Sequence, residues 1–313
     1  MSPSPAKRKR TEDAIMKNSN FWFRDGSIVL QAANTQFRVH WSVLARHSSV
    51  FRDMQELPQP SDEPTVDGCP VIHLSDDPTD MEYILNMLYN PAFLAQKTLP
   101  LAAIGALIRL GRKYDFEELV QLAAARITSE TPTTLKEYDT FEPDYQAIVY
   151  YPGLEFDIVT LASENNLLSI LPFTYYDIVR ANSLVRLFKR IGKRDGTMAA
   201  WPLTHLRRCV IARERLLLKQ FELGYTLGWA RKWEFDDECT DPSSCRKSRE
   251  TITWDYRSFI ASLIPLPFLA QFKLCTACRK HATEAMAAGR EKMWQELPQI
   301  FDLPPWDQLK NDL

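Results

Sequence analysis

The stretch that decides the fold is FWFRDGSIVLQAANTQFRVHWSVLARHSSVFRDM, residues 21–54. Asp25-Gly26 marks a turn, and the apolar residues 28–30 that follow it suit a short strand. Apolar and polar residues alternate again over 36–40, so the two runs predict a β-hairpin. Apolar residues at helical spacing then occupy 43–54 and predict two short helices. The stretch therefore predicts a hairpin followed directly by helices.

An α+β pattern continues from this stretch and fills residues 21–131. Residues 57–70 hold four prolines and predict a loop, and Val71-Ile72-His73-Leu74 predicts a third strand. The amphipathic helices expected after it begin near Pro78, Leu101 and Phe116. We therefore predict an α+β domain in which a short sheet is flanked by a helical cluster.

Residues 1–20 differ in composition from this domain. They contain Ser-Pro-Ser-Pro and the run Lys7-Arg8-Lys9-Arg10, with no periodic apolar pattern before Phe21. We predict a disordered basic tail, and its basic run is of the kind that can act as a nuclear import signal. The polar N-terminus predicts no signal peptide, and no apolar run approaches the roughly 20 residues that cross a bilayer. We expect an intracellular protein, in the nucleus or the cytoplasm, that does not engage a membrane.

Residue types at fixed spacing between Asp25 and Met54 resemble the opening of BTB/POZ domains. The matching residues are Asp25-Gly26-x-Ile28-Val29-Leu30 and then Phe37-x-Val39-His40, Leu44-Ala45, Ser48, Phe51 and Met54. The resemblance extends over roughly residues 21–130. It implies a domain that homodimerises and recruits protein partners. Some relatives are adaptors of cullin ubiquitin ligases, and others are transcriptional regulators.

The resemblance and the apolar triplet at residues 21–23 together give a candidate interface with a partner or a second copy. Its residues are Phe21, Trp22, Phe23, Asp25, His40, Leu44, Ser48, Phe51 and Met54. Leu44, Phe51 and Met54 also have the helical spacing of core positions, and His40 also suits a hydrogen-bonded structural role. Trp41 stands where many relatives carry Lys or Arg, so the charged pocket of the transcription-linked members is not expected here.

Two further segments resemble the large BTB-containing families of mushroom-forming fungi. They are Asp67-Gly68-Cys69-Pro70, before the third strand, and the ending Leu303-Pro304-Pro305-Trp306-Asp307-x-Leu309. No defined activity transfers from those families. No kelch-type repeat, zinc-finger array or ankyrin repeat follows the domain, so the usual substrate-reading module is missing.

Residues 132–313 predict a mainly α-helical region. The longest periodic stretch runs from Pro202 to about Trp233, and residues 236–249 predict a polar loop. A last helix is expected from about Thr276 to Leu297. One face of the longest stretch presents Leu203, Leu206, Val210, Leu217 and Phe221. We expect that face to be buried in the core of the region.

Charge is distributed unevenly along this region, although the formal net charge of the chain is only -2. Residues 137–164 hold seven acidic residues and no Lys or Arg, whereas residues 180–232 hold 13 Lys and Arg residues against three acidic ones. These segments suit two solvated faces or a basic patch that contacts RNA or DNA. The overall charge and the lack of an interleaved aromatic platform disfavour nucleic acid as the partner. A nuclear transcriptional regulator with such a basic region is nevertheless the first alternative function.

The spacing of four cysteines suggests a metal site. Cys239-x5-Cys245 and Cys275-x-x-Cys278 are two thiol pairs separated by a long insertion, which is the ligand arrangement of structural zinc. A reducing cell interior disfavours disulfides. Reduced thiols without a ligand and a redox pair remain alternatives, and His281 would be the substitute ligand if one thiol were not used. We expect tetrahedral zinc on the four sulfurs.

No local sequence motif announces an enzyme. The chain lacks Gly-x-Gly-x-x-Gly, a phosphate loop, Gly-x-Ser-x-Gly and His-Glu-x-x-His, and its five histidines have no telling neighbours. The second alternative function is an enzyme whose unrecognised C-terminal pocket joins perturbed acids to His205 or His281. We expect a non-enzymatic scaffold or adaptor instead.

Overall fold

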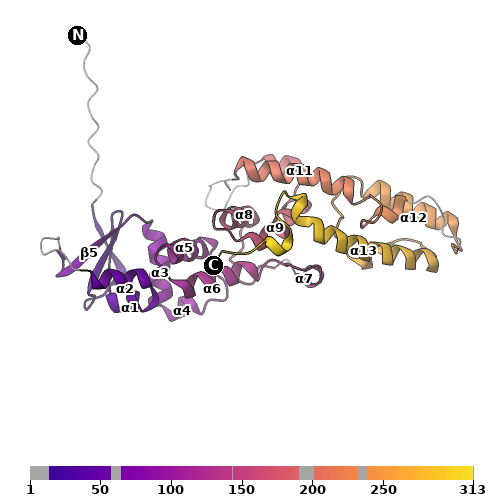
Figure 1. Ribbon diagram of the computed structural model, residues 1–313. Helices are drawn as coiled ribbons and strands as arrows, with labels where there is room; N and C mark the ends of the chain where they lie inside the picture. Colours follow the sequence, from indigo (N-terminus) through magenta and orange to yellow (C-terminus); the bar gives the residue numbers. More distant parts are fainter. Residues whose placement is uncertain (1–13, 58–64, 143, 190–200, 232–237, 313) are drawn as a thin grey trace, which may run out of the picture. The chain divides into compact units, whose positions relative to one another are not determined.

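The computed structural model describes residues 14–57, 65–142, 144–189, 201–231 and 238–312. The chain forms two compact units, residues 1–124 and 125–312, and the division falls within helix α6 (Glu117–Thr128), close to the predicted boundary at residue 131 (Figure 1). The first unit has the expected α+β fold, and the second is mainly helical. The basic run at residues 7–10 lies outside the described residues.

A five-stranded sheet forms one layer of the first unit. The strands are β1 (Met16–Trp22), β2 (Ile28–Ala32), β3 (Thr35–Val39), β4 (Thr65–Val66) and β5 (Cys69–Leu74), in the order β1-β3-β2-β5-β4. The predicted hairpin is the antiparallel pair β2 and β3, and β5 joins β2 in parallel. Strand β1 lies parallel to β3 at the sheet edge. It begins at Met16, so the prediction of a disordered tail over residues 1–20 was wrong for its last five residues.

Helices pack with this sheet to complete the first unit. They are α1 (Trp41–His47), α2 (Ser49–Glu56), α3 (Pro78–Tyr89), α4 (Pro91–Leu94), α5 (Leu101–Lys113) and α6. Polar side chains fix where two of them begin. The Ser48 hydroxyl accepts a 3.0 Å hydrogen bond from the backbone N–H of Phe51, and the Asp77 carboxylate accepts one of 2.8 Å from Thr79. Ile28, Val29 and Leu30 are all fully buried, so the central strand β2 is covered on both faces.

The second unit is built from seven α-helices and short 3-10 turns among its described residues. The helices are α7 (Leu135–Thr140), α8 (Leu154–Glu164), α9 (Leu171–Ala181), α10 (Leu184–Phe188), α11 (Leu203–Lys219), α12 (Pro242–Asp255) and α13 (Thr276–Ile300). Tyr175 and Tyr176 of α9 are fully buried, which places α9 in the centre of the unit. None of the described helices is both long enough and apolar enough to span a membrane.

Helix α11 ends at Lys219 and turns a different face inward from the one predicted. Its buried residues are His205, Cys209, Ala212 and Leu216. Leu203 is 76% exposed, and Val210 and Leu217 are only partly buried. Phe221 of the predicted face is buried, but the leucine stripe on the helix itself is not the core face, because Cys209, Ala212 and Leu216 make the contact with the rest of the unit.

Helix α12 replaces most of the polar loop predicted over residues 236–249. The Asp241 carboxylate accepts a 3.1 Å hydrogen bond from the backbone N–H of Ser244, and Pro242 occupies the first helical position. Capping by Asp followed by Pro is a recognised helix start. The signal was present in the sequence, but polar residues on the rest of the helix obscured it.

Candidate functional site

Four cysteines converge in the second unit as the spacing predicted. The sulfur atoms of Cys239, Cys245, Cys275 and Cys278 all lie within 4.8 Å of one another. All six cysteines of the chain are free thiols. A tetrahedral zinc with Zn–S bonds of about 2.3 Å places its sulfurs about 3.8 Å apart, so the spacing fits one metal ion. His281 is not part of this cluster.

The start of two helices positions the four thiols. Cys245 lies in the first turn of α12 and Cys278 in the first turn of α13, and both are fully buried. Cys275 is the N-cap of α13, and Cys239 lies in the turn before α12. Free N–H groups and the positive end of the helix dipole favour thiolate at such positions. The expected location of Cys275 and Cys278 is confirmed, whereas the prediction that Cys245 lies in a polar loop was wrong because α12 buries it.

Hydrogen bonds and charge around the sulfurs also favour thiolate. The backbone N–H of Cys275 donates to Cys245 Sγ at 3.2 Å, and that of Cys278 donates to Cys275 Sγ at 3.5 Å. The N–H of Cys278, followed by that of Thr240, lowers the pKa of the Cys275 thiol to about 5. The buried Arg249 guanidinium lies 3.9 Å from Cys278 Sγ. Such contacts commonly surround thiolates that hold a metal.

Burial acts in the opposite direction on the two inner thiols. It raises the pKa of Cys278 and that of Cys245, because a thiolate loses solvation there. A divalent cation among four sulfurs would compensate the thiolate charge that burial disfavours. The donor set is all sulfur and closed, which suits a structural zinc rather than a catalytic one.

The cluster lies at the end of a buried apolar core. Ile252 of α12 and Ala282 and Met286 of α13 belong to one set of buried side chains. A metal at the cysteines would therefore tie together the N-terminal ends of both helices. The arrangement supports a structural role in the second unit.

In the first unit, Asp25 and His40 of the candidate interface lie close together. Asp25 Oδ1 is 3.3 Å from His40 Nε2, and its own backbone N–H followed by His40 lowers the pKa of the Asp25 carboxyl. The backbone N–H of His40 donates to the Tyr89 hydroxyl at 2.9 Å. Phe23 stacks on Tyr89 with ring centroids 4.9 Å apart. These contacts support the structural role expected for His40.

Other candidate interface residues lie inside the unit. Leu44, Ser48 and Phe51 are at most 1% exposed, and the Ser48 hydroxyl donates to the carbonyl of Tyr114. Trp41 is also buried, and its Nε1 donates to the carbonyl of Phe51 at 3.0 Å. This explains why an aromatic residue stands at that position. Any effect of Leu44, Ser48 and Phe51 on an interface would therefore be indirect, through the shape of the core.

The remaining members reach the surface to different degrees. Phe21 is 4% exposed, and Trp22, Phe23, His40 and Met54 are partly exposed. Asp25 is exposed. Two apolar residues at the start of β1 and just before it were not predicted as part of this surface: Met16 and Ile15, each 56% exposed.

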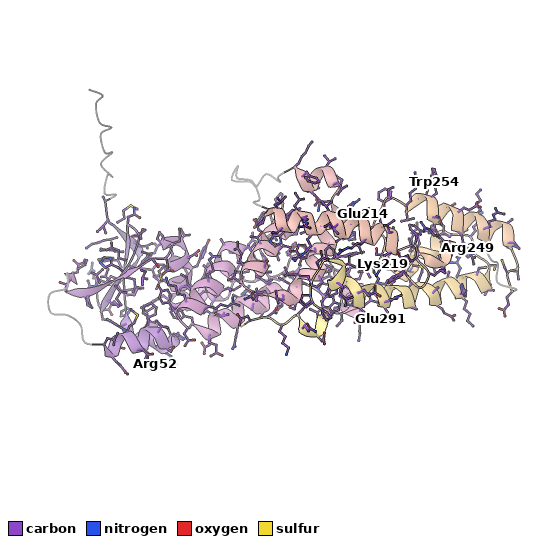
Figure 2. All side chains as sticks on the ribbon, turned by 45° about the horizontal axis from the view of Figure 1, so that its top comes forward. Arg52, Glu214, Lys219, Arg249, Trp254 and Glu291 are labelled. Carbon is purple, nitrogen blue, oxygen red and sulfur yellow. The ribbon has the colours of Figure 1, made fainter. Side chains whose placement is uncertain are left out.

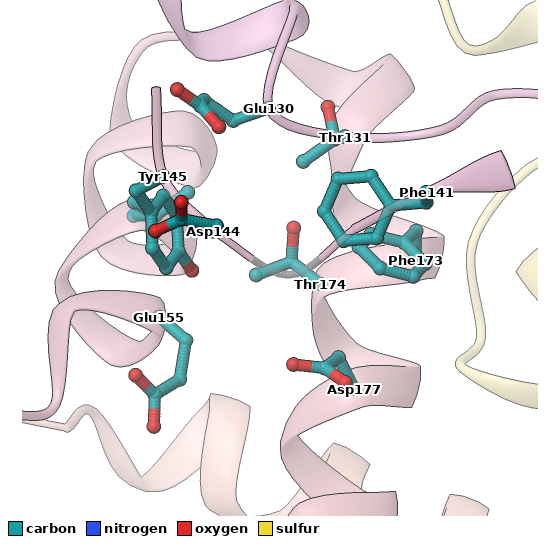
Figure 3. Close-up of a pocket in the computed structure, with 10 residues that line it drawn as sticks. Glu130, Thr131, Phe141, Asp144, Tyr145, Glu155, Phe173, Thr174 and Asp177 are labelled. Carbon is teal, nitrogen blue, oxygen red and sulfur yellow. The ribbon is translucent and has the colours of Figure 1, made fainter. Parts of the chain in front are cut away.

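A pocket in the second unit is lined by carboxylates and aromatic rings. Its cavity volume is about 40 Å³. Figure 3 shows Glu130, Asp144 and Glu155 on one side and Phe141 and Phe173 on the other. Burial raises the pKa of the Glu155 carboxyl, and nearby Asp177 adds to the effect.

This pocket does not provide the site that the enzyme hypothesis required. Neither His205 nor His281 is among the described residues that line it. The His205 imidazole contacts the Tyr175 hydroxyl elsewhere in the unit, at 2.5 Å. The acids and the histidines are thus not brought together.

Several residues of the basic segment are paired within the fold. Arg215 lies 2.6 Å from Asp302, and Lys219 lies 2.5 Å from Glu296. Arg213 donates to the backbone carbonyl of Val179 at 2.6 Å. Much of the positive charge counted in the sequence therefore serves the structure of the unit.

Comparison with known proteins identifies the first unit. Residues 20–130 match the family model of the BTB/POZ domain. BTB/POZ domains mediate self-association and binding to other proteins, and they are typically not enzymes. No curated protein matches the chain.

Proposed function

We propose that this protein, whose residues 20–130 are a BTB/POZ domain, is a homodimeric scaffold that recruits partner proteins. The match of that domain carries the proposal. The hairpin, the parallel strand β5 and the helices α1–α6 support it, since they place the matched residues in one compact unit. The second unit provides further surface for partners.

The edge of the sheet supports the homodimer. Strand β1 is exposed along most of its length, and Ile15, Met16 and Trp22 place apolar surface on or beside it. An exposed edge strand with apolar side chains is a favourable site for pairing with another chain. A twofold arrangement would bury the same patch on both copies. We propose that β1 and Phe23 contribute to this contact.

We propose a cullin as the partner of the BTB/POZ domain, so that the protein acts as a ubiquitin-ligase adaptor inside the cell, in the nucleus or cytoplasm. The sequence resemblance supports this role, and the segments at residues 67–70 and 303–309 support placement among the fungal BTB-containing families. Affinity purification of the full-length protein from its native cells tests the partner. We expect a cullin to co-purify.

Two matched variants make that experiment specific. Met54→Asp changes a partly exposed residue of the BTB/POZ domain and should remove the cullin. Leu203→Asp changes a residue that is 76% exposed in the second unit and should retain it. Recovery of dimeric protein without a cullin would reject the adaptor role and leave the homodimer standing.

We also propose that Cys239, Cys245, Cys275 and Cys278 bind one structural zinc ion. The converging sulfurs and the N–H groups that donate to them support this assignment. When bound, zinc would supply a cross-link between the starts of α12 and α13. The metal would thus hold the shape of the second unit and take no part in a reaction.

A further inference from the structure

A groove of about 500 Å³ runs along the outer side of α11 in the second unit. Its apolar lining comes from Leu184, Val210, Leu217, Leu218 and Phe221. Leu218 is 62% exposed and Leu184 of α10 is 42% exposed. The groove therefore offers accessible apolar surface, although Phe221 in its lining is buried and belongs to the core.

Helix α11 carries two apolar faces, and only one of them is used inside the unit. Cys209, Ala212 and Leu216 are fully buried and make the core contact. Val210, Leu217 and Leu218 form the second face at a spacing of two helical turns, about 12 Å along the axis. Among the described residues, none covers the 62% of Leu218 that is exposed. A straight apolar stripe of this length suits the packing of another helix.

Positive charge lies along the rim of the same groove. Arg213, Arg231 and Arg257 line it together with one acid, Glu214. The Arg231 guanidinium lies 4.9 Å from the ring of Phe221, and that of Arg257 lies 3.7 Å from the ring of Trp254. Figure 2 shows Glu214 on α11 and Trp254 on α12.

Among the described residues, both rim arginines contact aromatic rings rather than carboxylates. No ion pair joins Arg231 or Arg257 to a carboxylate in the part of the chain that the structure describes. Their contacts are with aromatic rings and, for Arg257, with the carbonyl of Trp254. Three arginines against one glutamate leave the lining with a positive excess. A partner with carboxylates would match this charge.

We infer that the groove along α11 docks an amphipathic helix of a protein partner, with large aliphatic residues facing Leu217 and Leu218 and acidic residues facing Arg231 and Arg257. Nucleic acid fits less well, because Phe221, the one aromatic residue among the described lining residues, is only 3% exposed and offers bases little surface on which to stack. All residues of the site belong to the second unit. The inference therefore goes beyond the BTB/POZ domain and does not depend on its partner.

Binding of two designed peptides to the full-length protein tests the inference. Both carry leucine at i, i+3, i+4, i+7 and i+11 of a helix and a fluorescent label; one has glutamate at its flanking positions, and the other has lysine. We expect saturable binding of the glutamate peptide, at least tenfold tighter than that of the lysine peptide, and weaker at high salt.

Substitutions then locate the site. Leu218→Glu and the double change Arg231→Glu with Arg257→Glu should each weaken binding of the glutamate peptide at least tenfold. Leu203→Glu and Arg207→Glu alter exposed residues of α11 outside the groove and should leave binding within twofold of wild type. All five positions are exposed, so thermal unfolding should change little.

Several results would overturn the inference. These are no binding of the glutamate peptide, equal binding of both peptides, and unchanged binding by Leu218→Glu protein. Displacement of the peptide by a 20-nucleotide single-stranded RNA would assign the groove to nucleic acid instead. Self-association of the chain that Leu218→Glu abolishes would assign it to a second copy.

Discussion

The sulfur of Cys275 lies 3.9 Å from the sulfur of Cys239, although the two residues are 36 positions apart in the chain. This contact brings the turn before α12 to the N-cap of α13, and Cys245 and Cys278 complete the cluster. A cross-link there would close a long loop. Zinc bound there would cross-link the second unit at a place far from the BTB/POZ domain in sequence.

The purified protein should contain about one zinc ion per chain, as measured by inductively coupled plasma mass spectrometry. Cys278→Ser should reduce the content below half an equivalent, because one of the four ligands is lost. Cys209→Ala alters a buried cysteine outside the cluster and should retain the metal. Less than a tenth of an equivalent in well-folded, reduced wild-type protein would defeat the proposal.

Removal of the metal should destabilise the second unit. A zinc chelator should lower the free energy of unfolding by about 2–4 kcal/mol, the scale of a cross-link that closes a loop of this length. Cys275→Ser should cost a similar amount and make the protein insensitive to the chelator. Urea unfolding followed by circular dichroism provides the measurement, and equal chelator sensitivity of variant and wild type would speak against a shared site.

The carboxylate pocket predicts a pH dependence of stability. Burial raises the pKa of Glu155 above its ordinary 4.5, so this group stabilises the fold at low pH and the contribution is lost as pH rises through the folded pKa. Glu155→Gln should therefore raise the unfolding temperature at about pH 7.5 but not at about pH 4. Glu142→Gln, at an exposed position nearby, is the matched control. An equal effect of Glu155→Gln at both pH values would contradict this account.

Truncation of two candidate interface residues, Phe51 and Met54, should change stability by different amounts because they differ in burial. Phe51→Ala should destabilise the first unit by about 3–5 kcal/mol, since the ring is 1% exposed and its loss leaves a cavity. Met54→Ala should cost less than about 1 kcal/mol, because that side chain is partly exposed. Thermal and denaturant unfolding measure both. Similar costs for the two changes would show that the core is arranged differently.

The sequence predicted the hairpin, the third strand and the helices of the first unit because each carries a clear periodicity. Strand β1 was missed because it is an edge strand with one buried residue, Phe21, and so lacks an alternating pattern. The prediction of which face of α11 is buried was wrong for its leucines, because leucine spacing alone does not determine which face a neighbouring element covers. Cys209 and Ala212 make that contact with small side chains.

The cysteine cluster was predicted from spacing because a metal site needs its ligand types in pairs. The burial of Cys245 was not predicted, because the polar residues over 236–249 indicate a loop rather than the helix α12. The groove along α11 had no signal of its own in the sequence. It combines Leu184, Leu218 and Arg257 from separate segments, and only the tertiary fold brings them together.

The molar mass of the full-length protein in solution tests the central claim most directly. Sedimentation equilibrium at about 10 micromolar, a concentration at which interfaces of moderate affinity are formed, should give twice the 36.2 kDa mass of one chain. Trp22→Glu, on β1 at the sheet edge, should shift the equilibrium toward the monomer while the circular dichroism spectrum is preserved. A well-folded wild-type protein that remains at 36.2 kDa up to tens of micromolar would contradict the proposal of a homodimeric scaffold.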